Sequence, residues 1–399
     1  MRVESIKGLD ELKAMCADDR CRRFVLEACP GIDAAASLTR FNTRIHPRDQ
    51  MLLHSLQHHR DAGAAFSQYF AVARQQYASA MQIVRSVFGI DAGRVDLLDF
   101  ACGYGRLLRY LTLALPPAQL WASELQSDAV AYVADAFGVQ TITSHAEPEL
   151  FQPGRSFDVI WVASLFSHLP ERLFHAWLER LHALLTPRGV LCFSVRDAAL
   201  LPSGDTLPPS GIVYLQHSEN ADLATDIYGT TYASEDFVRR AATRFAGTAP
   251  ALYRLPRALA NEQDIYVLAK DSQRNLSALD GFRRGPWGWL DQRMLCADGT
   301  LQLQGWAASL DDGEIDHVSV EVAGQSFRCT GGIARPDVAA AFGDARLGHA
   351  GWRLEHAFAV GTHATEIAVT VHSRRGEVSP LYIGSVRASG PGDAAESGV

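Results

Sequence analysis

The segment from residue 97 to residue 105 most limits the folds that this chain can adopt. Its sequence is Leu-Leu-Asp-Phe-Ala-Cys-Gly-Tyr-Gly, so an apolar run leads into an acidic residue and then into a loop of small residues. The apolar run predicts a buried parallel strand, and the leucine-rich residues 106–115 predict the helix that follows, ended by two prolines. Gly103 and Gly105 then lie at a strand-to-helix crossover, where a missing Cβ lets the backbone approach a ligand. An ordinary crossover turn has the same pattern, since a single Gly-x-Gly is a weak nucleotide signal.

Two further positions narrow the class of ligand. Leu108 stands where a dinucleotide fingerprint places a glycine or an alanine, which disfavours a pyrophosphate. The strand-like residues 119–123 lead into Glu124, at the place where a parallel sheet presents a carboxylate to the ribose hydroxyls of an adenosine. An adenosine without a pyrophosphate indicates S-adenosylmethionine.

At these positions the chain resembles the class I S-adenosylmethionine-dependent methyltransferases, whose first motif is an acidic residue followed by a small-x-Gly-x-Gly loop. Asp99, Cys102, Gly103 and Gly105 fall on that motif. Ala101 replaces its usual first glycine, which is sterically acceptable only if this residue keeps a negative φ. The resemblance implies a methyltransferase that uses S-adenosylmethionine and needs no metal.

Later segments agree with the same family in order and spacing. Residues 156–164 resemble its fourth strand, and residues 184–195 resemble the helix end, turn and fifth strand. The periodicity of residues 171–185 independently predicts a helix with one apolar face. Ser234 is a plausible N-cap for a helix to about residue 245, and two strands at 251–255 and 264–268 would close the sheet. The expected fold is α/β: a Rossmann-like seven-stranded methyltransferase sheet with an N-terminal helical cap, plus a C-terminal β-sandwich.

The resemblance also implies which residues hold the cofactor. Asp99, Gly103 and Gly105 would hold the methionine end and Glu124 the ribose, while the adenine would lie against residues after the second and third strands. His145 stands where many relatives carry an acidic residue. Tyr69 lies on a helix of the kind that covers the cofactor in this family, although an aromatic residue on a helix also suits a core. The candidate cofactor-binding residues are Tyr69, Asp99, Ala101, Gly103, Gly105, Glu124, Leu125, His145, Ala146 and Ser164.

Two residues are candidates for catalysis. His168 follows the fourth strand, titrates near neutral pH and could take a proton from an acceptor hydroxyl, while a structural role explains a histidine there equally well. Residues 198–231 form an insertion after the fifth strand, either a lid over the site or a disordered excursion. At its end we expect Tyr228 or Tyr232 near the acceptor, with Tyr232 as the catalytic candidate; a packed, capping turn is the alternative.

The sequence pattern changes near residue 283, after which segments of alternating apolar and polar residues are separated by short turns. This pattern predicts a β-sandwich over 283–388, which resembles the accessory β-domains of bacterial glycan-assembly enzymes. Trp306 and Trp352 would either stack on sugars or pack in the core. The expected domains are 1–92, a helical region capping the cofactor site; 93–272, the methyltransferase core with its lid insertion; 283–388, the sandwich; and 389–399, a disordered tail.

Composition excludes several classes of function. A formal net charge of −8 disfavours a nucleic-acid partner, and the insertion contains no lysine or arginine. No apolar run is long enough to predict a membrane span, and the N-terminus lacks the apolar core of a signal peptide, so a cytoplasmic location is expected. The seven cysteines include no CxxC pair, which predicts reduced thiols rather than disulfides or zinc. Cys16, Cys21 and Cys29 leave a weak metal alternative.

The resemblance to the methyltransferases, together with that of the β-domain, implies an O-methyltransferase that acts on a sugar or another small acceptor in cell-surface glycan assembly, with a protein or glycan partner at the sandwich. A non-catalytic adenosylmethionine-binding scaffold with a β-sandwich interaction module is the main alternative, supported by Ala101 and His145. A nicotinamide-dependent oxidoreductase is third, and Leu108 disfavours it.

Overall fold

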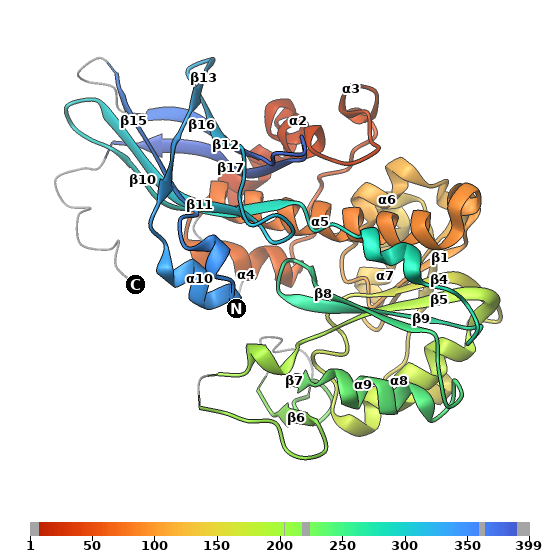
Figure 1. Ribbon diagram of the computed structural model, residues 1–399. Helices are drawn as coiled ribbons and strands as arrows, with labels where there is room; N and C mark the ends of the chain where they lie inside the picture. The colour runs from red at the N-terminus through yellow and green to blue at the C-terminus, as the bar shows by residue number, and fades with distance from the viewer. Residues whose placement is uncertain (1–7, 203, 218–223, 359–363, 389–399) are drawn as a thin grey trace. The chain divides into compact units, whose positions relative to one another are not determined.

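The computed structural model describes residues 8–202, 204–217, 224–358 and 364–388, and the chain divides into two compact units (Figure 1). One unit contains residues 40–42 and 72–282, and the other contains residues 1–39, 43–71 and 283–399. The expected tail at 389–399 lies outside the described residues. Helix α5 (Ala62–Phe88) contributes its first ten residues to the second of these units and the rest to the first.

The first unit is built on a seven-stranded sheet with the strand order β3-β2-β1-β4-β5-β9-β8. Strands β1 to β5 are parallel, whereas β9 is antiparallel to both β5 and β8, which is the expected closing pair. The strands are β1 (Leu97–Phe100), β2 (Leu120–Glu124), β3 (Gln140–Thr143), β4 (Phe157–Val162), β5 (Leu185–Val195), β8 (Leu252–Leu259) and β9 (Gln263–Ala269). This arrangement confirms the predicted methyltransferase sheet.

Helices cover both faces of this sheet. Helices α8 and α9 lie on one face, and α6 with the second half of α5 lies on the other (Figure 1). The predicted apolar face of α8 packs into the main core cluster through Leu173, Phe174 and Trp177. Ser234 caps α9 as predicted, because its Oγ accepts a hydrogen bond from the N–H of Phe237. The helices are α6 (Leu108–Ala114), α7 (Ser127–Phe137), α8 (Glu171–Ala183) and α9 (Glu235–Thr243).

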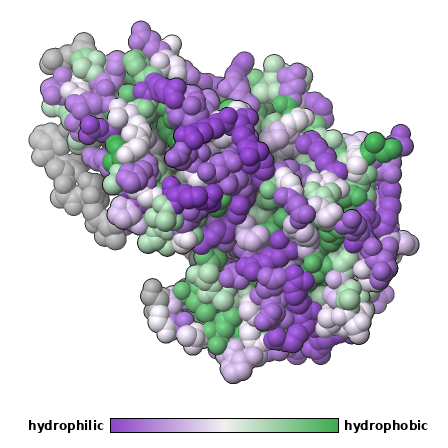
Figure 2. Space-filling view, in the orientation of Figure 1, coloured by the Kyte–Doolittle hydropathy of each residue, from purple (hydrophilic) through white to green (hydrophobic). Residues whose placement is uncertain are grey.

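The insertion after β5 contains a short hairpin. Strand β6 (Ile212–Leu215) pairs antiparallel with β7 (Thr230–Ala233), while residues 203 and 218–223 of the expected lid lie outside the described residues. Figure 2 shows apolar residues on the displayed face at the lower left, over this segment, and Leu215 is 37% exposed.

The second unit contains two four-stranded sheets, β10-β11-β15-β14 and β13-β12-β16-β17, in which all pairings are antiparallel. Residues of both sheets share one core, so the predicted sandwich is confirmed. Trp352 is buried in that core, whereas Trp306 is half-buried against Phe342. The strands are β10 (Pro286–Leu295), β11 (Thr300–Ser309), β12 (His317–Val322), β13 (Gln325–Arg328), β14 (Thr330–Ile333), β15 (Gly351–Ala357), β16 (Ala364–His372) and β17 (Val378–Arg387), with helix α10 (Pro336–Phe342).

The N-terminal helices belong to the same unit as the sandwich. They are α1 (Leu9–Ala17), α2 (Asp19–Glu27), α3 (Ala34–Ser37), α4 (Gln50–His59) and the start of α5. Small residues bring α5 against β17: Gly63 lies beside Tyr382, and Ser67 Oγ accepts a hydrogen bond from the N–H of Ile383 at 2.9 Å. The expected single helical region over 1–92 is therefore divided between the two units, and a capping role for it stays a prediction.

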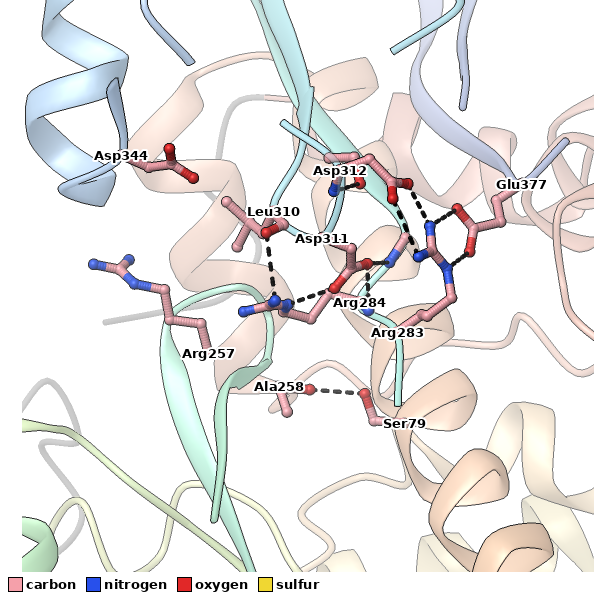
Figure 3. Close-up of polar contacts among 12 residues, drawn as sticks. Ser79, Arg257, Ala258, Arg283, Arg284, Leu310, Asp311, Asp312, Asp344 and Glu377 are labelled. Carbon is pink, nitrogen blue, oxygen red and sulfur yellow. Dashed lines mark hydrogen bonds and ion pairs between the residues drawn. The ribbon is translucent and has the colours of Figure 1, made fainter. Parts of the chain in front are cut away.

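The predicted start of the sandwich coincides with a group of ion pairs (Figure 3). Arg283 donates to Asp312 Oδ2 at 2.5 Å and to both carboxylate oxygens of Glu377, at 2.5 and 3.0 Å. Arg284 donates to Asp311 Oδ1 at 2.9 Å. Two adjacent arginines thus tie the first residues of this segment to loops of the sandwich.

Within the described residues, no helix is long and apolar enough to cross a membrane, and no group of three or more histidine, cysteine or acidic side chains could hold a metal ion. No disulfide joins the seven cysteines.

Candidate active site

Asp99 occupies the carboxyl end of β1 and is 3% exposed. Its Oδ2 has no hydrogen-bond partner among the described residues. Burial, together with the neighbouring Glu124 carboxylate, raises the pKa of Asp99 to about 8. Because a buried carboxylate without a donor is unfavourable, Asp99 is mostly protonated at neutral pH in the free protein.

The loop after β1 turns through left-handed backbone conformations. Ala101, Gly103 and Gly105 have φ values of 58°, 55° and 77°. The condition stated for Ala101, a negative φ, is not met. The N–H of Cys102 donates to Ser123 O on β2 at 3.1 Å, so the chain must turn sharply at Ala101, at a cost of about 1–2 kcal/mol for a residue with a Cβ.

The two glycines of this loop have different surroundings. A Cβ built on Gly103 would meet no atom within 4 Å, so this position leaves open space beside the backbone. A Cβ on Gly105 would lie 2.5 Å from Cε2 of Phe137 on α7. Packing alone therefore explains Gly105, while Gly103 is the glycine at which a ligand could approach the backbone.

Glu124 lies at the carboxyl end of β2, beside this loop. Its Oε2 accepts the N–H of Gly103 at 2.9 Å, and its Oε1 accepts the N–H of Leu125 at 2.6 Å. Each carboxylate oxygen has a second lone pair, so the side chain can still accept hydrogen bonds from ribose hydroxyls. The structure thus brings together Asp99, Gly103 and Glu124, as the sequence predicts.

The residues predicted around adenine are exposed at the ends of neighbouring strands. Leu125 is 37% exposed, and His145 and Ala146 follow β3. The N–H of Ser144 donates to Glu124 O at 2.8 Å, which joins the two strand ends. Adenine contacts of these residues stay predictions, as does the role of Tyr69, which belongs to the other unit, is buried, and donates to Asp49 Oδ2 at 2.7 Å.

Ser164 belongs to a polar network at the carboxyl ends of β4 and β5. It has a φ of 60°, and its N–H donates to Ser194 Oγ at 2.7 Å. Gln263 on β9 completes the network, because Nε2 donates to Ser164 Oγ at 3.1 Å and Oε1 accepts from Ser194 Oγ at 2.8 Å. Sequence reasoning missed Gln263 because its only signal is a polar residue at the start of a strand.

His168 is buried after β4 and contacts the end of the insertion. Its Nδ1 lies 2.6 Å from Gly229 O, and its ring stacks on Tyr228 with the centroids 4.4 Å apart and the planes at 11°. Tyr232 is half-buried on β7, where it pairs with Val213 across the hairpin. Among the described contacts, Tyr228 is the tyrosine against His168, and a catalytic role for Tyr232 stays a prediction.

Comparison with protein families identifies a domain in the segment that contains Asp99, the loop after β1 and Glu124. Residues 98–191 match the model described as "Methyltransferase domain", which is less than half of the 399-residue chain. This segment is a class I S-adenosylmethionine-dependent methyltransferase domain. Its cofactor is S-adenosylmethionine, and the match leaves the β-domain uncovered, so the likeness of that domain to accessory domains of glycan-assembly enzymes stays a prediction.

Solved structures similar to the methyltransferase domain cover part of the chain. A TehB-like methyltransferase from Corynebacterium glutamicum is 16% identical over 48% of this chain and 88% of its own, with a TM-score of 0.32. Magnesium protoporphyrin IX methyltransferase from Synechocystis is 14% identical over 52% and 87%, with a TM-score of 0.34. The 1,6-didemethyltoxoflavin-N1-methyltransferase from Burkholderia thailandensis, solved with 1,6-didemethyltoxoflavin and S-adenosylhomocysteine, is 19% identical over 47% of this chain and 77% of its own, with a TM-score of 0.32. A search of curated proteins found no match.

Proposed function

We propose that the protein transfers a methyl group from S-adenosylmethionine to a hydroxyl oxygen of a sugar or another small acceptor in cell-surface glycan assembly, with His168 as the general base. The observation that carries the proposal is the contact of His168 Nδ1 with Gly229 O at 2.6 Å. A carbonyl oxygen can only accept a hydrogen bond, so Nδ1 carries the hydrogen and Nε2 is the basic nitrogen.

The cofactor would be held by the ends of β1 and β2. Asp99 would receive the ammonium of the methionine moiety, the open backbone at Gly103 would lie beside it, and Glu124 would accept the ribose hydroxyls. The bound sulfonium supplies an activated methyl group, so the protein has mainly to orient the acceptor and exclude water. In that arrangement His168 Nε2 would accept the proton that the acceptor hydroxyl loses.

The charges in the described part of the insertion favour a neutral acceptor over an anionic one. The described part of the insertion carries Asp205 and Asp226 and has no lysine or arginine. An anionic acceptor would meet like charges and no positive side chain from this segment. A sugar hydroxyl meets this condition. The glycan context itself is supported by the resemblance of the β-domain and by Trp306, which is half-buried.

The test uses the full chain and S-adenosylmethionine with a deuterated methyl group. Incubation with a panel of sugars, nucleotide sugars and a small-molecule extract should yield one labelled product detected by mass spectrometry. The His168→Ala variant should keep its cofactor affinity and lose about 10²–10⁴-fold in turnover, whereas His175→Ala on α8 should keep both. Cofactor binding without transfer to any acceptor would contradict the proposal and support a non-catalytic scaffold.

A further inference from the structure

We propose that Tyr228 and Gly229, at the end of the insertion, are positioning residues that set the tautomer and the pKa of the His168 imidazole. The inference deepens the proposed function, in which His168 is the base, and rests on it for its catalytic meaning. Tyr228 and Gly229 lie some sixty positions after His168 in the chain, and their contacts with it come from folding alone.

The first contact fixes the tautomer. Gly229 O accepts the hydrogen of His168 Nδ1 at 2.6 Å, and the N–H of Gly229 donates back to His168 O at 2.8 Å. This reciprocal pair holds the two residues opposite each other through both backbone and ring. With the hydrogen on Nδ1, the lone pair of the neutral ring is on Nε2.

The second contact fixes the plane of the ring and favours its charged form. The Tyr228 ring lies parallel to the imidazole, with the centroids 4.4 Å apart. The face of an aromatic ring carries negative electrostatic potential, so it stabilises an imidazolium more than a neutral imidazole. In a buried position, where desolvation disfavours the cation, this contact helps His168 to accept a proton.

Neighbouring hydrogen bonds hold residues 229–231 beside residues 167–169. The N–H of Thr231 donates to Ser167 O at 2.8 Å, and Thr231 Oγ1 donates to Leu169 O at 2.6 Å. These bonds flank His168 on both sides. Residues 167–169 and 229–231 therefore form one paired unit around the imidazole.

Gly229 has no room for a side chain. A Cβ there would lie 2.3 Å from Leu215 O and 2.8 Å from Cε2 of Tyr214, both on β6. A substitution must therefore move the carbonyl that holds Nδ1. The hairpin β6–β7 thus supports the group that sets the tautomer.

The experiment is nitrogen NMR of the full-length protein labelled at histidine, with the His168 signals assigned by their loss in His168→Gln. We expect the Nδ1–H tautomer in the wild type. Tyr228→Ala should lower the pKa of His168 and leave the Nδ1–H tautomer in place, and Tyr228→Phe should restore the wild-type pKa because it keeps the stacked ring. Tyr253→Ala, on β8, is the matched control and should leave both quantities unchanged.

These outcomes distinguish the positioning role of Tyr228 and Gly229 from the proposed base role of His168. An Nε2–H tautomer in the wild type, or an unchanged pKa of His168 in Tyr228→Ala, would overturn the inference. Gly229→Ala should give a mixture of tautomers. If Gly229→Ala fails to fold, Tyr228→Ala still tests the inference. None of these signals depends on methyl transfer, so retained turnover in His168→Ala would overturn the base role alone.

Discussion

The Glu124 carboxylate accepts the backbone N–H of Gly103 at 2.9 Å, although 21 positions separate the two residues in the chain. This bond joins the loop after β1 to the end of β2. It also places the carboxylate near Asp99, since Glu124 contributes to the raised pKa of that residue. One acidic side chain therefore holds the loop after β1 and raises the pKa of its neighbour, and its proposed role is to accept the ribose hydroxyls.

Replacing Glu124 should weaken cofactor binding. Glu124→Ala removes the acceptors for the ribose and the partner of Gly103 N–H, so we expect a loss of about 2–4 kcal/mol in the free energy of binding S-adenosylmethionine. Isothermal calorimetry measures it, with the exposed Glu149→Ala as the control. Equal affinities in a folded Glu124→Ala variant would show that this assignment is wrong.

Cofactor binding should release a proton from Asp99. Its pKa of about 8 means that the side chain is mostly protonated at pH 7 in the free protein, and a bound ammonium group favours the carboxylate. Calorimetry in two buffers with different ionisation enthalpies should detect about one proton released per cofactor at pH 7. Asp99→Asn should release none. Absence of release from the wild type would contradict the raised pKa.

The same group should make the stability of the free protein depend on pH. The pKa of Asp99 is raised from 3.8 in the unfolded chain to about 8 in the folded protein, so its stabilising contribution is complete below about pH 4 and is lost as the pH rises through 8. The free energy of unfolding of the wild type should therefore fall relative to that of Asp99→Asn between pH 5 and pH 8. Urea denaturation of both proteins at pH 5 and pH 8 gives the difference between their free energies of unfolding. If this difference is the same at both pH values, Asp99 does not contribute to the pH dependence of stability.

Ala101 should be more stable as glycine. Its φ of 58° is strained for a residue with a Cβ, so Ala101→Gly should raise the free energy of unfolding by about 0.5–1 kcal/mol after the added freedom of the unfolded chain is counted. Ala131, exposed in the middle of α7, provides the contrast, since Ala131→Gly should lower it by about 1 kcal/mol. Thermal or chemical denaturation compares the two; destabilisation of both variants alike would argue against strain at Ala101.

Crowding at Gly63 should destabilise the unit that contains the sandwich and leave cofactor binding intact. A Cβ on Gly63 would lie 2.7 Å from the Tyr382 hydroxyl and 2.8 Å from Ile383 O, so Gly63→Ala should cost about 1–3 kcal/mol. Gly93→Ala is the control, because a Cβ there meets nothing within 4 Å. Denaturation monitored by tryptophan fluorescence measures the loss. If Gly63→Ala proved as stable as Gly93→Ala, α5 would not pack closely on β17.

Local sequence determined the parts of this protein in which neighbouring residues act together. The apolar run into Asp99, the glycine loop and the periodic face of α8 depend on strand and helix geometry, so they predicted the sheet, the loop and the core face correctly. The alternation after residue 283 predicted the sandwich for the same reason.

Tertiary structure decided what depends on residues distant in the chain. The left-handed Ala101 follows from a hydrogen bond to β2, and Gln263 reaches Ser164 only because β9 folds back beside β5. Likewise, the small residues of α5 are explained only by the close packing of β17 against them. His168 stacks on Tyr228 because the end of the insertion returns to the end of β4. The periodic pattern of apolar residues specifies which face of a helix or strand a side chain occupies. Which distant residue it contacts depends on packing and hydrogen bonding among all the elements of the fold.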